Sequence, residues 1–363
     1  MPLSPERLRA IAHKVVHECA GVRPGENVFI EGRLDSVDYL EMLALECELA
    51  GGRPLMIARS DELLRRRLDE LSPEQLEVAS QSWIDAVKAA DVVFSVRLED
   101  GKPQLFADAP ADKMGAHRRG RKLISDHIYD GSRRWVGTDY PTVEQAAAFH
   151  LDFAAFEEMF WRALDVDYRA LSERAERVCA VLDGAREVRV RSAKGTDLAL
   201  RIDGRPLDRD IGVVTDAAKL TNLPAGEVCL APLESSADGR VIFDLAFRNG
   251  VRIEDLEVRF AGGVAQALGA ARGLETFQQV VATATGAANV IAELGIGLNP
   301  EVGEPCGYTL TDEKILGTVH IAVGDNRMLG GVNDSSLHWD MMILAPSVEV
   351  DGTPLLEQGD LVV

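Results

Sequence analysis

Two short apolar runs near the C-terminus, residues 318–323 and 337–343, constrain the fold of this chain most. Valine, isoleucine, methionine and tryptophan dominate them, so we predict that each run is a strand. Residues 324–331 connect them and contain three glycines, an aspartate and an asparagine. Such a turn-rich connection predicts that the second strand folds back beside the first in one sheet.

Both runs carry side chains that can bind metal ions. Strand alternation puts His320 on the face opposite Val319 and Ile321. His338 and Asp340 share one face of the second strand, with side-chain origins about 6.5–7 Å apart, so one ion fits between them. A hydrogen-bonded His-x-Asp couple and a core histidine explain the same pattern. This stretch alone therefore leaves a metal site and a structural pair as alternatives.

Other catalytic or nucleotide-binding motifs find little support. Ser335 and Ser336 precede His338, but the chain has no Gly-x-Ser-x-Gly elbow, and a triad is recognised by its spatial roles. The glycines at 295 and 297 are followed by Pro300 where a dinucleotide fingerprint needs its third glycine. We therefore predict neither a serine hydrolase nor an NAD site.

The charge balance excludes nucleic acid as a partner. The net charge is −20 and the pI is about 4.8, whereas a nucleic-acid binder needs a basic surface to neutralise phosphate. Two basic runs, residues 65–67 and 118–122, lie in polar stretches, and we interpret them as solvated faces. A local contact with an anion stays open.

Cysteine usage and hydropathy indicate the compartment. The five cysteines are scattered, odd in number and without a C-x-x-C pair, as a reducing compartment permits. The N-terminus has no long apolar segment, and no window reaches 18 consecutive apolar residues. We expect a soluble cytoplasmic protein with no membrane partner.

The pattern of elements changes in the middle of the chain. Strands expected at 26–32, 54–58 and 91–96 alternate with helices, which predicts an α/β region with a parallel sheet. From residue 187 onward short alternating strands dominate, including predicted strands at 223–228 and 290–294, the latter ended by glycines. With 363 residues we expect two domains, an α/β N-terminal domain (1–172) and a strand-rich α+β C-terminal metal-binding catalytic domain (173–363).

Two glutamates stand out inside the predicted strands of the second domain. Glu227 opens the apolar run 228–230, and Glu293 lies within the run 290–294. A carboxylate in a half-buried strand is costly unless it is paired or holds a metal ion. An exposed strand face is the alternative explanation for each.

Together these residues resemble, in order, the five metal ligands of the thermophilic aminopeptidase family, peptidase family M29 of the aminopeptidase T type. The similarity spans the second half of the chain, including GTDLAL (195–200) and DEKILGT (312–318), whereas the first half is similar in layout only. The matching residues are Glu227 in NLPAGEV, Glu293 in AELGIGLNP, His320 in GTVHIAVGDN, and His338 and Asp340 in LHWD.

The resemblance implies a homodimeric metallo-aminopeptidase that removes N-terminal residues from small peptides or amides. It implies two divalent ions per chain, Zn, Co or Mn, which share a carboxylate and activate a water. Glu293 is then either a ligand or the general base, and the other four residues are ligands. The family carries a tyrosine seven residues after the first histidine, where this chain has Arg327. We expect Arg327 to contact an oxyanion or a carboxylate, and this departure leaves the peptide substrate open.

The chain also resembles 2,5-dihydroxypyridine 5,6-dioxygenase, whose non-haem iron is held by two histidines and one aspartate. That pattern keeps the His-x-Asp pair but has histidine in place of Glu293 and apolar residues in place of Glu227 and His320. Three carboxylates and two imidazoles suit a pair of divalent ions better than one oxygenase iron. A ring-cleaving dioxygenase and a metal-binding protein without peptidase activity are the alternatives.

Overall fold

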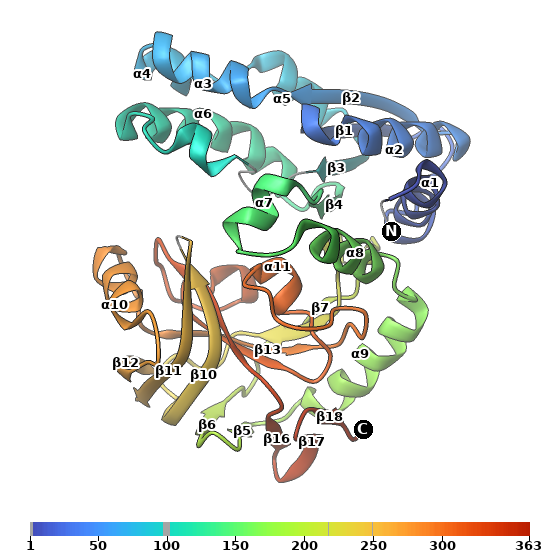
Figure 1. Ribbon diagram of the computed structural model, residues 1–363. Coiled ribbons are helices and arrows are strands. Elements are labelled where there is room, and N and C mark those ends of the chain that lie inside the picture. Colours follow the sequence, from blue (N-terminus) through green and yellow to red (C-terminus); the bar gives the residue numbers. More distant parts are fainter. Residues whose placement is uncertain (1–2, 97–101, 217, 249) are drawn as a thin grey trace. The chain divides into compact units, whose positions relative to one another are not determined.

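The computed structural model describes residues 3–96, 102–216, 218–248 and 250–363 (Figure 1). Its internal contacts divide the chain into two compact units. The first unit contains Met1–Asp165 and Gly212–Leu223, and the second contains Val166–Ile211 and Pro224–Val363. The sequence suggested a single boundary between residues 172 and 173. In the structure this point lies inside helix α9, and Gly212–Leu223 returns to the first unit.

The first unit is built on a parallel sheet, as its alternating strands and helices predict. The strand order is β2-β1-β3-β4-β8, and every neighbouring pair is parallel. The strands are β1 (Asn27–Arg33), β2 (Arg53–Arg59), β3 (Val92–Val96), β4 (Arg134–Thr138) and β8 (Leu220–Leu223). The helices are α1 (Pro5–Lys14), η1 (Val15–Cys19), η2 (Leu34–Ser36), α2 (Val37–Leu49), α3 (Asp61–Glu70), α4 (Pro73–Glu77), α5 (Gln81–Lys88), η3 (Pro103–Phe106), α6 (Ala111–Ile128), α7 (Val143–Ala148) and α8 (Phe153–Leu164).

Helix α6 covers part of this sheet. Its Ile124 and Ile128 join Phe29, Val93 and Trp135, from three neighbouring strands, in a buried apolar cluster. The same helix packs against α4 and α5. Burial of these large side chains is the main force that attaches the α3–α6 region to the sheet.

Two helices, α7 and α8, lie between residues 141 and 165. His150 takes a positive φ of 60° between them. The carboxylate of Asp152 then caps α8 by accepting a hydrogen bond from the amide of Ala155 at 3.0 Å. The cap begins a second helix, which explains why the helical pattern is interrupted between α7 and α8.

The second unit consists, among its described residues, of antiparallel strands, three α-helices and one short 3-10 helix. Thirteen strands form one sheet with the main order β18-β17-β16-β5-β6-β10-β15-β14-β13-β9-β7, and β11 and β12 continue from β10. The long β10–β11 hairpin stands out in Figure 1. The elements are α9 (Tyr168–Leu182), β5 (Glu187–Arg191), β6 (Asp197–Arg201), β7 (Asp208–Asp210), β9 (Glu227–Leu230), β10 (Asp238–Arg248), β11 (Val251–Ala261), β12 (Val264–Gly269), α10 (Leu274–Thr283), β13 (Ile291–Gly297), α11 (Thr309–Asp312), η4 (Arg327–Leu329), β14 (Val319–Gly324), β15 (His338–Ile343), β16 (Ser347–Val350), β17 (Thr353–Glu357) and β18 (Asp360–Leu361).

Two strand predictions need correction. The run 223–228 is not one strand: it contains the end of β8 and the start of β9, which belong to different sheets. Pro224 cannot donate to a ladder, and Gly226 has a φ of +134°, so the chain turns between the two strands. The glycines after residue 294 do not end β13 either, because the strand continues through Gly297.

Among the described residues no helix is both long enough and apolar enough to span a bilayer. The five cysteines are all buried and outside any disulfide among the described residues.

Candidate metal centre

Four adjacent antiparallel strands, β15, β14, β13 and β9, bring the five sequence-predicted ligands together. Glu293 on β13 is opposite Ala322, which in turn is opposite Asp340 on β15. His320 on β14 is opposite Gly295, two residues along β13. Side chains two residues apart on a strand share a face, so the glutamates, histidines and aspartate project from the same side of the sheet.

The five side chains form two triads that share Glu293. In the first, His320 Nε2 lies 3.2 Å from Glu293 Oε1 and 3.3 Å from Glu227 Oε2. In the second, His338 Nε2 lies 3.2 Å from Glu293 Oε2 and 3.5 Å from Asp340 Oδ2. Each triad places one potential ligand atom per residue within 4.8 Å of the others. Glu293 thus presents one oxygen to each triad.

A glycine makes room for the imidazole of the first triad. A Cβ at Gly295 would lie only 1.9 Å from His320 Nε2, so the ring crosses β13 directly over this residue. His320 is fully buried, and Glu227 and Glu293 are nearly so. The glycine that ended the predicted strand is in fact the residue that lets the histidine reach both glutamates.

We predict that Gly295→Ala disrupts the first triad. The added methyl group must displace the His320 ring, and overpacking of this kind costs about 1–3 kcal/mol of stability. Metal content by mass spectrometry should fall along with the urea midpoint. The matched control is Gly269→Ala, a strand glycine whose Cβ would have nothing within 4 Å. Equal metal content in the two variants would contradict the role of Gly295.

The imidazole of His338 is oriented by the chain that leads into β15. Its Nδ1 lies 2.7 Å from the main-chain oxygen of Asp325. A carbonyl can only accept, so Nδ1 donates. When Nε2 gives up its proton, its lone pair points to the space shared with Glu293 and Asp340, where a metal ion would bind. This is the tautomer that a metal ligand requires.

A buried lysine, which the sequence analysis did not single out, completes the centre. Lys314 is fully buried, and its Nζ donates to Glu227 Oε1 at 2.6 Å and to Asp210 Oδ2 at 3.0 Å. It also lies 3.0 Å from Glu313 Oε1. Glu227 therefore gives one oxygen to the lysine and turns the other toward His320. Its sequence signals were the charged triplet at residues 312–314 and its place in the DEKILGT motif (312–318).

Unpaired polar atoms show that the residues suit a bound cation. Glu227 Oε2, Asp340 Oδ1 and His320 Nδ1 are buried without a hydrogen-bond partner. Buried polar atoms normally have partners, and two of these three belong to carboxylates of the triads. Carboxylates and imidazoles are the donor set of Zn, Co and Mn sites. The donor atoms thus fit divalent metal ions.

The charges of the centre support the same conclusion. Burial raises the pKa of Glu227 to about 8. Burial also acts to lower the pKa of His320, but its hydrogen bond to Glu293 and the nearby carboxylates raise it to about 9. The pKa of His338 is raised to about 12 by Asp340 and Glu293, against the effect of burial. In the absence of a metal ion, protons therefore supply the positive charge that this group of carboxylates requires.

Arg327, the remaining predicted site residue, lies in η4 and is half exposed. Its guanidinium pairs with Asp325 Oδ2, to which Nε donates at 2.8 Å, and with Asp334 Oδ1 at 3.0 Å. The main-chain oxygen of Asp325 is the acceptor for His338. Arg327 is therefore joined to the second triad through one intervening residue and makes no direct ion pair with the five ligands among the described residues.

A third group of metal-capable side chains lies in the first unit. His13 Nδ1 and His17 Nε2 both approach Glu46 Oε2, at 2.8 and 3.3 Å. Arg9 Nε also pairs with Glu46, at 3.0 Å, so the protein itself balances this carboxylate. We therefore take the two triads that share Glu293 as the candidate metal centre.

Known proteins share both the sequence pattern and the fold. The sequence profile of one family, thermophilic metalloprotease (M29), matches residues 4–362. Aminopeptidase T of Thermus aquaticus is 26% identical over 98% of this chain and 96% of that protein. Aminopeptidase T of Thermus thermophilus is 25% identical over 98% of both.

Two solved structures have a similar fold. Wild-type AmpT from Thermus thermophilus matches with a TM-score of 0.76 and 22% identity over 99% of each chain. The 2,5-dihydroxypyridine dioxygenase from Pseudomonas putida KT2440 matches with a TM-score of 0.70 and 15% identity, over all of this chain and 99% of that one. At these identities the two structures establish the fold alone.

Proposed function

The chain belongs to the thermophilic metalloprotease family M29, and from this membership we propose that it is a metal-dependent aminopeptidase acting on small peptides. One observation carries the proposal: Glu293 lies in both triads and offers a separate oxygen to each. A shared carboxylate is what a pair of metal ions needs in order to lie close together.

In this proposal Glu227, Glu293, His320, His338 and Asp340 hold two divalent cations of the Zn, Co or Mn type. Bound there, the cations would supply Lewis acidity, which lowers the pKa of a water and polarises the scissile carbonyl. Glu293 would either stay a ligand or take up the proton of that water at one of its Oε atoms. Lys314 keeps Glu227 in place by its 2.6 Å hydrogen bond, and Asp325 keeps His338 in its ligating tautomer.

The test measures metal content and turnover in the same preparation. We expect about two Zn, Co or Mn ions per chain and hydrolysis of aminoacyl substrates with a free amine. N-acetylated versions of those substrates should not be cleaved, and a chelator should abolish turnover until metal is restored. One Fe(II) per chain with oxygen consumption on a dihydroxypyridine would instead support the dioxygenase. Bound metal with no turnover on a broad aminoacyl panel would also overturn the proposal.

Arg327 is the proposed contact for an oxyanion or a substrate carboxylate. Asp325 and Asp334 orient its guanidinium, and the Arg327 side chain is 55% exposed. Arg327→Met should lower kcat/KM about tenfold at unchanged metal content, since one charge-assisted hydrogen bond is lost. The matched control, Arg189→Met, removes an arginine that pairs with Asp197 on the β5–β6 hairpin. Equal kinetics for the two variants would remove Arg327 from the site.

A further inference from the structure

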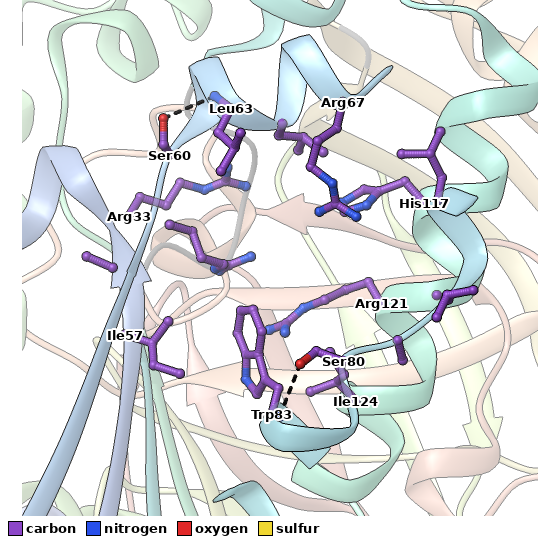
Figure 2. A pocket seen from close by; sticks show the side chains of 17 residues that line it. Arg33, Ile57, Ser60, Leu63, Arg67, Ser80, Trp83, His117, Arg121 and Ile124 are labelled. Atoms are coloured by element: carbon purple, nitrogen blue, oxygen red, sulfur yellow. Dashed lines mark hydrogen bonds between the residues drawn. The ribbon is translucent and has the colours of Figure 1, made fainter. Parts of the chain in front are cut away.

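The two basic runs of the sequence meet in a cavity of the first unit (Figure 2). The cavity has a volume of about 570 Å³, within the range of small-molecule sites. Arg67 from residues 65–67 and Arg121 from residues 118–122 both line it, together with Arg33. Their polar surroundings in the sequence predict that both runs are solvated faces. Arg66 is exposed in this way, whereas Arg67 and Arg121 are partly buried and line the cavity.

The arginines reach the cavity from three separate elements. Figure 2 shows Arg33 at the end of β1, Arg67 on α3 and Arg121 on α6 extending toward the same space, with Arg67 directed toward His117. The described lining contains no aspartate or glutamate. In a chain with a net charge of −20, such a lining is unusual, because surface cations have many carboxylates available as partners.

Two of these arginines, Arg121 and Arg67, have guanidinium donors that no described carboxylate occupies. Glu31 accepts from Arg121 Nη2 at 2.6 and 2.7 Å, while Nη1 of the same guanidinium is buried without a hydrogen-bond partner. Arg67 forms no ion pair with any described residue. An unpaired guanidinium donor at a cavity wall is a ready partner for a carboxylate or phosphate oxygen.

The rest of the lining is apolar. Ile57, Leu64, Leu76 and Ile124 contribute aliphatic surface, and the Trp83 ring lies under Arg121, whose Cζ is 4.8 Å from the ring centroid. This stacking fixes the direction of the guanidinium. Val78 lines the same cavity and is 72% exposed, which places it where solvent reaches the cavity.

We propose that this cavity binds a small amphipathic organic anion, with an apolar or aromatic body and one carboxylate, phosphate or sulfonate group. The anionic group would accept hydrogen bonds from Arg67 and Arg121. The body would pack on the aliphatic side chains of β2, α4 and α6. The site is separate from the candidate metal centre in sequence and in chemistry, and it does not depend on the proposed peptidase activity.

The test uses 8-anilinonaphthalene-1-sulfonate as the probe and the full chain as the protein. Fluorescence titration should show saturable binding, and Arg67→Met should weaken it about tenfold, the effect of one lost charge-assisted hydrogen bond. The matched control is Arg66→Met, which removes the same charge from the neighbouring, exposed position. It should stay within about twofold of the unmodified chain, since an exposed charge away from the cavity is largely screened.

Two further measurements keep the proposal open to refutation. The uncharged analogue N-phenyl-1-naphthylamine should bind at least about tenfold more weakly than the sulfonate, since it cannot pair with the arginines. Val78→Asp, a change at an exposed position, should also weaken sulfonate binding, even if Arg67→Met fails to fold. Equal binding of the neutral and anionic probes, or equal losses in Arg66→Met and Arg67→Met, would overturn the proposal.

Discussion

Glu293→Gln should lower turnover by about two to four orders of magnitude. Removing the charge leaves His320 Nε2 and His338 Nε2 without the carboxylate that each approaches at 3.2 Å. Loss of one partner of a buried charged pair costs about 3–5 kcal/mol. If this cost raises the free energy of the transition state, the turnover rate falls by the corresponding factor. The amide keeps the shape of the side chain, so the fold should survive.

Metal analysis of the same variant separates the two roles that remain open for Glu293. Loss of both metal and turnover identifies a ligand, whereas retained metal with lost turnover identifies the general base. The matched control is Glu275→Gln, an exposed residue in the first turn of α10, which should behave like the unmodified chain. Full metal content and full turnover in Glu293→Gln would contradict the whole assignment.

Lys314→Met should destabilise the second unit more than any other single change at the centre that keeps a similar side-chain volume. It leaves the carboxylates of Asp210, Glu227 and Glu313 buried without the ammonium group that contacts all three. Breaking a buried ion network from one side costs about 3–5 kcal/mol. Urea unfolding of metal-free protein measures this loss directly.

The control for this change is Lys194→Met. Lys194 also pairs with two carboxylates, Asp244 and Asp255, but its side chain is 49% exposed. Exposed ion pairs contribute about 0–1 kcal/mol, so the urea midpoint should shift little. If the Lys314 variant were as stable as the Lys194 variant, the buried network would have no structural role.

The ligand strands were predictable because local sequence and long-range packing agree there. Residues 318–323 alternate β-branched side chains with small ones around His320, and β14 forms in that register. Local sequence and structure also agree at the start of α9. Asp167 caps this helix, because its carboxylate accepts hydrogen bonds from the amides of Arg169 and Ala170.

The rest of the centre could not be predicted because its causes lie far apart in sequence. Asp210 lies in the polar triplet of β7, and it meets Lys314 only because β7 pairs with β9. The sequence predicts that Gly295 ends a strand. It makes room for the imidazole only because β13 and β14 pair with Gly295 opposite His320. Arg67 and Arg121 line the same cavity because α3 and α6 pack together. The charge pattern of the sequence does not show that these two helices are in contact.

The order of the strands also has a consequence for synthesis on the ribosome. The fifth strand of the parallel sheet, Leu220–Leu223, pairs with β4 although more than 80 residues separate them. A nascent chain that has emerged only as far as residue 172 therefore still has an open edge at β4. Unpaired edges attract other strands, so fragments that stop short of residue 223 should aggregate. The first unit should reach its native state only after residues 166–211 of the second unit have also been translated.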